Sequence, residues 1–163
     1  MPRIQVGIRF RPCDRDEQQL AGLSLDPESG RVGLSTNETV HKFQFDNVFG
    51  EASTQQEVFC SSTQPIIDSV MEGFNGCVFA FGQTGSGKTH TMSGPPVYHY
   101  DTVGLVPRAA QYIFKRIAEL AQHKTQSISI SVRLSAMEIY NEGMHDLLKE
   151  VCLLGIPPIL DIV

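Results

Sequence analysis

The sequence predicts an α/β fold, in which helices flank a layered sheet. Three features support this prediction. Residues 4–11 alternate apolar and polar side chains with the period of two that is typical of a half-buried strand. Residues 54–71 and 107–120 repeat apolar side chains at helical spacing. Between these helices, residues 77–81 are apolar on both faces, as in a central strand of a sheet covered on both sides.

The first strand is expected to end at Pro12, because proline has no amide hydrogen with which to continue a sheet. Residues 14–39 are rich in Asp, Glu, Gly and Ser, and we expect them to form hairpins and loops. Residues 43–49, which read FQFDNVF, alternate again. They predict a second strand that closes at Gly50.

The first helix carries its own start signal. Residues 54–57 read TQQE, the capping-box pattern of a hydroxyl followed three residues later by a carboxylate. Pro65 is expected to bend this helix or split it in two. The glycines within residues 73–76 should end it, and Cys77 is then expected in the core as part of the central strand.

The second half of the chain predicts one more long helix and one long strand. Residues 94–96 (GPP) should stop the helix that begins at Lys88. Pro107 suits the first turn of the next helix, where its missing amide hydrogen costs nothing, and Arg108 is expected on the polar face. Residues 127–134 alternate, and the long strand they predict is expected to run on through residues 138–140.

Composition and charge narrow the class of protein. The chain has 163 residues, 41% hydrophobic and 19% charged, which suits one domain or part of a larger one. No apolar run reaches the roughly 20 residues that span a bilayer, and no signal peptide is expected. The formal net charge of −5 gives no reason to expect nucleic acid or an anionic membrane as partner. Widely scattered cysteines favour reduced thiols over a zinc site: Cys13, Cys60, Cys77 and Cys152.

Residues 82–89 read GQTGSGKT, the Walker A pattern, between an apolar stretch and a helix as the pattern requires. The three glycines let the backbone curl so that several amides point at one anion, and the following helix adds the positive end of its dipole. Lys88 supplies a point charge for the β and γ phosphates, and the Thr89 hydroxyl is placed to hold Mg²⁺. A chance glycine-rich turn explains this context poorly. The loop therefore predicts binding of a nucleoside triphosphate with magnesium.

Further stretches of the chain resemble motifs of the kinesin motor domain family, in the family's order and approximate spacing. They are RFRP at 9–12, FQFDNVF at 43–49, the phosphate loop at 82–94 with its lead-in at 72–81, GLVPR at 104–108 and EIYNEGMHDLL at 138–148. The resemblance covers residues 3 to about 149. It implies the P-loop NTPase-type layered sheet of the kinesin motor domain, here incomplete: the N-terminal half, with a central mixed sheet flanked by helices.

The resemblance also assigns roles in binding ATP. Arg9 and Pro12 would frame the adenine, with the planar guanidinium of Arg9 against the base. His90 would stack on the other face of the purine; the alternative is an ordinary surface histidine. Arg11 is expected on the solvated face of its strand. The residues that would wrap the phosphates are Gln83, Thr84, Gly85, Ser86, Gly87, Lys88 and Thr89, with Thr89 also on Mg²⁺.

No catalytic residue is predicted in this chain. Glu138, Glu142 and Asp146 invite an acid–base or metal interpretation. We reject it, because the resemblance makes this region a structural corner between a strand and a helix, with Leu147 and Leu148 buried.

Two kinesin motifs that would follow the matched region, N-x-x-S-S-R-S-H (switch I) and D-L-A-G-S-E (switch II), do not occur in these 163 residues. In the family they support hydrolysis of the γ-phosphate. We therefore expect residues 1–150 to form the N-terminal part of a motor domain, inactive alone, with an unpaired sheet edge and exposed apolar surface. Residues 151–163 are an apolar tail unlike the family, and Asp161 within it is interpreted as a decoy of a magnesium ligand.

By resemblance, the chain is an ATP-binding protein that acts in microtubule-based movement. The resemblance places it in the cytoplasm, on the microtubule cytoskeleton. It implies tubulin as the partner, bound by the family's microtubule-binding surface. That surface is expected to be absent from this chain. One alternative is a truncated isoform that binds nucleotide or a partner without catalysis. Another is a different P-loop NTPase such as a GTPase, although the N-K-x-D guanine motif does not occur.

Overall fold

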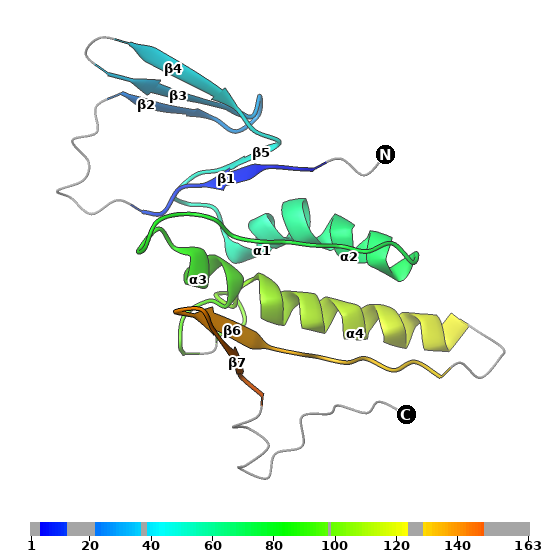
Figure 1. Cartoon of the computed structure of the whole chain (residues 1–163). Coiled ribbons are helices and arrows are strands. Elements are labelled where there is room, and N and C mark those ends of the chain that lie inside the picture. The colour runs from blue at the N-terminus through cyan, green and yellow to red at the C-terminus, as the bar shows by residue number, and fades with distance from the viewer. Residues whose placement is uncertain (1–3, 13–21, 37–38, 98, 124–128, 149–163) are drawn as a thin grey trace. The chain divides into compact units, whose positions relative to one another are not determined.

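The chain forms two compact units, Met1–Lys115 and Arg116–Val163. Figure 1 labels its helices and strands and colours them in chain order. The computed structural model describes residues 4–12, 22–36, 39–97, 99–123 and 129–148. Within these residues the first strands precede the helices and a last pair of strands follows them. The predicted α/β class is confirmed. Within the described ranges, no helix combines the length and the apolar character needed to cross a membrane.

Two small sheets belong to the first unit. Strand β1 (Gly7–Arg9) pairs in parallel with β5 (Asn47–Phe49). Strands β2 (Leu23–Asp26), β3 (Arg31–Ser35) and β4 (Val40–Gln44) form an antiparallel sheet in that order, which confirms the expected hairpins as far as residues 14–39 are described.

The single strand expected over residues 43–49 is two strands, β4 and β5. The backbone changes partner between them: the Phe45 amide donates to the Gly30 carbonyl, and the Asp46 amide donates to the Val6 carbonyl, each at 2.8 Å. The chain therefore leaves one sheet and joins the other within two residues.

The first helical segment is split in the way that its sequence predicts. Helix α1 (Gln55–Val58) continues through a π-helical turn, η1 (Phe59–Thr63), into α2 (Gln64–Met71). The capping box is confirmed, because the Thr54 hydroxyl accepts from the Glu57 amide at 3.1 Å and the Glu57 carboxylate accepts from the Thr54 amide at 2.7 Å. Pro65 is the second residue of α2, which comes directly after the π-helical turn.

The core of the first unit lies where these helices meet the start of α4 (Leu105–His123). The rings of Phe59 and Tyr112 pack edge to face, with centroids 5.9 Å apart, and the Tyr112 hydroxyl donates to Asp68 at 2.8 Å. Pro107 occupies the first turn of α4, as predicted. The buried core residues are Phe49, Val58, Phe59, Ile67 and Leu105.

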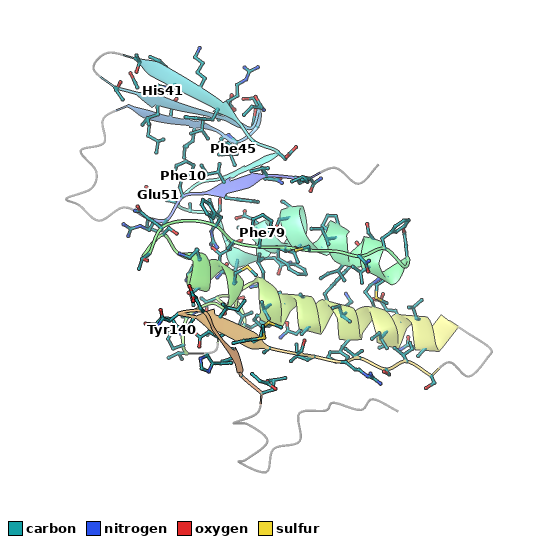
Figure 2. The ribbon with its side chains drawn as sticks, viewed as in Figure 1. Phe10, His41, Phe45, Glu51, Phe79 and Tyr140 are labelled. Carbon is teal, nitrogen blue, oxygen red and sulfur yellow. The ribbon has the colours of Figure 1, made fainter. Side chains whose placement is uncertain are left out.

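The central strand predicted over residues 77–81 is wrong, because residues 74–82 form a segment with no strand assignment. Val78 packs against the core, whereas Phe79 and Phe81 are 79% and 95% exposed. Figure 2 labels Phe79 on this segment. Cys77 is also exposed rather than in the core. A strand needs a neighbouring backbone for its amides and carbonyls, and none of the described strands pairs with this segment. The expected exposed apolar surface is confirmed here.

In the second unit, β6 (Met137–Tyr140) and β7 (Gly143–Asp146) form an antiparallel hairpin. Asn141 and Glu142 both have positive φ, 49° and 63°, which is the backbone of a two-residue hairpin turn. This turn reverses the chain, so the predicted strand-to-helix corner is wrong.

Two further expectations fail in the same unit. The long strand predicted over residues 127–140 is confirmed only at β6: residues 129–136 carry no strand assignment, and 127–128 lie outside the described residues. Leu147, predicted to be buried, is 49% exposed, and its amide donates to the Ala136 carbonyl at 2.9 Å, which continues the hairpin pairing; Leu148 is half-buried.

Candidate functional site

The loop of residues 82–87 connects the extended segment to α3 (Lys88–Met92). Gly85 and Gly87 have φ of 80° and 95°, a left-handed backbone that side chains other than glycine rarely adopt. A Cβ at either position would meet no atom within 4 Å, so glycine is required there by backbone conformation and not by space. The Ser86 amide donates to the Gln83 carbonyl at 3.2 Å and closes the turn. The backbone thus curls as the Walker A pattern predicts.

Lys88, the first residue of α3, folds back over this loop. Its ammonium nitrogen donates to the carbonyls of Gly82 and Gln83, each at 2.9 Å. A lysine ammonium carries three donors on a flexible stem, so it can exchange a loop carbonyl for a phosphate oxygen without a change in the backbone. The charge is therefore held where an anion cradled by the loop would meet it.

Thr89 and His90 follow on α3, and both side chains are exposed. A magnesium ion that arrives with phosphates keeps several waters and needs only one or two protein ligands. The exposed Thr89 hydroxyl fits such a ligand. Across the described ranges, no group of three or more His, Cys, Asp or Glu side chains could hold a metal ion, and Glu138, Glu142 and Asp146 are exposed.

Arg9 on β1 reaches the helix that follows the loop. Its Nη1 donates to Gln55 Oε1 at 2.8 Å and to Thr91 Oγ1 at 3.0 Å, and its Nη2 donates to the Ser53 carbonyl at 3.2 Å. Burial lowers the pKa of the Arg9 guanidinium from its ordinary value. The structure therefore brings Arg9 to the same helix that carries His90. Arg11 and Pro12 are both exposed.

Gln55 joins these elements, and it is not among the residues predicted from the sequence. It is 4% exposed; its Oε1 accepts from Arg9, and its Nε2 donates to the carbonyls of His90 at 2.7 Å and Thr102 at 3.2 Å. A signal for it exists in the sequence. Gln55 precedes Val58 and Phe59 at helical spacing, so it is a polar residue on the apolar face of its helix.

Arg108 was expected on the polar face of its helix, but it is 5% exposed. Its Nε donates to the Val103 carbonyl at 3.0 Å, its Nη2 donates to the carbonyls of Tyr100 and Asp101 at 3.0 Å each, and its Nη1 donates to Gln56 Oε1. The guanidinium carbon also lies 5.7 Å from the Tyr100 ring centroid. Arg108 therefore ties residues 100–103 to α1 and lines a cavity of about 440 Å³ beside them.

Residues 9–154 match the family model of the kinesin motor domain. The chain belongs to this family. It is 40% identical over 149 residues to the kinesin heavy chain of Syncephalastrum racemosum and 41% identical over 152 residues to the kinesin-like protein KIN-14Q of Oryza sativa subsp. japonica. Each alignment covers 90% of this chain, but it covers only 16% and 15% of those two kinesins.

Solved kinesin structures confirm the fold that the resemblance predicts. The structure of a fast kinesin superposes with a TM-score of 0.75 at 36% identity, over 89% of this chain and 40% of that one. The Drosophila kinesin family member Kin10/NOD, solved in complex with divalent manganese and ADP, superposes with a TM-score of 0.72 at 27% identity, over 98% of this chain and 50% of that one.

Proposed function

We propose that this chain binds ATP with Mg²⁺ through residues 82–89, as the nucleotide-binding part of a kinesin-like microtubule motor. The observation that carries the proposal is the curled loop with two left-handed glycines, over which the Lys88 ammonium is folded. Kinship with kinesins supports it, since one solved relative holds ADP and a divalent cation. Residues 1–150 form the motor-domain part in this proposal, and 151–163 form a tail, which lies outside the described residues.

Each residue has a separate task in the proposal. The backbone from Gln83 to Lys88 surrounds the phosphates with amides, and the Lys88 ammonium neutralises charge on the β and γ phosphates. The Thr89 hydroxyl binds Mg²⁺, which supplies further charge neutralisation between the same phosphates. Arg9 and His90 take the two faces of the adenine, with Pro12 at its edge.

These 163 residues should bind nucleotide without fast hydrolysis. Neither switch motif occurs among them, and in the family these motifs support hydrolysis of the γ-phosphate. Movement along microtubules, tubulin as partner and location on the microtubule cytoskeleton are proposed for the motor to which these residues contribute.

The test of binding is calorimetric titration of the purified chain with Mg-ATP and Mg-GTP, together with the variants Lys88→Ala and Lys42→Ala. Lys42 is an exposed lysine on β4 and serves as the matched control. We expect Mg-ATP to bind more tightly than Mg-GTP, Lys88→Ala to weaken binding at least about tenfold, and Lys42→Ala to leave it unchanged. Equal affinities for Lys88→Ala and the unaltered chain would contradict the proposal.

Turnover is measured separately, as phosphate release with and without microtubules. A rate above about one per second would show that these residues hydrolyse ATP without the switch motifs, and that part of the proposal would then be abandoned.

A further inference from the structure

Gln55 connects three parts of the first unit through the hydrogen bonds of its side-chain amide. It is buried, and a buried amide without hydrogen bonds costs free energy. Here both ends of the amide are used: the oxygen accepts from Arg9 at 2.8 Å, and the nitrogen donates to the carbonyls of His90 and Thr102 at 2.7 and 3.2 Å. Its orientation is therefore fixed, because a reversed amide would lose all three bonds.

The bonds of Gln55 close a ring with α3. Arg9 donates from the same nitrogen, Nη1, to Gln55 Oε1 and to Thr91 Oγ1, and Thr91 is the neighbour of His90. The guanidinium on β1 is thus fixed to α3 at two points, once directly and once through Gln55. All of these residues lie in the first compact unit.

Gln55 is separate from the phosphate loop. Its hydrogen bonds go to Arg9, His90 and Thr102, and Lys88 bonds instead to carbonyls of its own loop. A change at position 55 therefore acts on the distance between Arg9 and His90 before it acts on the backbone of residues 82–89.

We infer that Gln55 is a positioning residue for the base of the bound nucleotide: it holds the Arg9 guanidinium and the His90 backbone at a fixed separation, so that a planar base fits between the two side chains. This inference rests on the proposed binding of ATP. It predicts that loss of Gln55 lowers the affinity for the base half of the ligand and spares the affinity for the triphosphate half, because preorganisation is lost only around the base.

The experiment compares Mg-ATP with Mg-tripolyphosphate, which has the three phosphates and no base. Dissociation constants are measured by calorimetry for the unaltered chain and for Gln55→Ala, Gln55→Glu and Gln64→Ala. Gln64 on α2 is the matched control, a partly buried glutamine whose Nε2 donates to the Tyr112 hydroxyl at 3.4 Å. We expect Gln55→Ala to weaken the binding of Mg-ATP about tenfold and the binding of Mg-tripolyphosphate less than about twofold. Gln64→Ala should leave the ratio of the two affinities, Mg-ATP over Mg-tripolyphosphate, unchanged.

Gln55→Glu keeps an acceptor for Arg9 but cannot donate to the carbonyls of His90 and Thr102. It should therefore lower the affinity for Mg-ATP relative to that for Mg-tripolyphosphate, and it serves as the test if Gln55→Ala does not fold. Arg9→Lys combined with the position-55 variant should lose no more ATP affinity than Arg9→Lys alone, because the two residues act as one unit. Failure of the unaltered chain to bind either ligand would overturn the proposed function. Binding of both ligands, with equal losses or no loss in the Gln55 variants, would overturn this inference alone.

Discussion

Removal of the Arg108 side chain should lower the free energy of unfolding of the first unit. The size of the loss follows from the hydrogen bonds of the guanidinium and from the burial of its stem. Of the four oxygens that accept from it, those of Gln56, Tyr100 and Asp101 belong to exposed residues and can bond to water instead. The Val103 carbonyl belongs to a residue that is 3% exposed, and it would lose its donor in a buried place. An orphaned buried acceptor costs about 1–3 kcal/mol.

The stem of Arg108 adds to this cost. Two buried methylene groups lost in Arg108→Ala contribute about 1–2 kcal/mol, and relief from burying the charge offsets part of it. We expect a loss of about 3 kcal/mol in the free energy of unfolding for Arg108→Ala. Arg108→Lys keeps the charge and most of the stem, but an ammonium group cannot make the four hydrogen bonds of the guanidinium. The free energy of unfolding should therefore fall by about 2 kcal/mol.

The assay is urea unfolding followed by circular dichroism, with amide hydrogen exchange over residues 99–104 as a local readout. Gln56→Ala is the control, because it removes an exposed acceptor and should cost less than about 1 kcal/mol. Exchange over residues 99–104 should accelerate in the Arg108 variants more than in Gln56→Ala. A loss below about 1 kcal/mol for Arg108→Ala, or unchanged exchange, would refute the reasoning.

Two further predictions concern the capping box and the extended segment. Hydrogen bonds from the Thr54 amide and hydroxyl lower the pKa of Glu57 below 4.5, so the stability it contributes is present above that value and is lost as pH falls through the lowered pKa. Unfolding of Glu57→Gln should therefore depend less on pH in that window than unfolding of the unaltered chain, and parallel pH profiles would count against this. On the segment of residues 77–81, Phe81→Ser should change the free energy of unfolding by less than about 0.5 kcal/mol and reduce light scattering on concentration, because the ring is 95% exposed. Val78→Ser should cost about 2 kcal/mol, since Val78 packs on the core, and equal costs at both positions would show that Phe81 is packed as well.

The features that the sequence determined are those encoded by neighbouring residues. The phosphate loop needs glycines at set intervals and a lysine at the start of the next helix, and all of them lie within residues 82–89. The capping box and the division of the helix near Pro65 depend on three or four adjacent residues in the same way. The family could also be named from such short stretches, and the match over residues 9–154 confirms it.

Tertiary structure decided what depends on partners far along the chain. Residues 77–81 have the apolar pattern of a central strand, but a strand exists only where another backbone pairs with it, and Phe79 and Phe81 are exposed. Gln55 and Arg108 read as polar side chains of helices; their burial follows from carbonyls of His90, Thr102 and Val103, which lie close only after the chain has folded. Local spacing therefore determined the loop that would hold the phosphates, and long-range packing decided which side chains hold its surroundings in place.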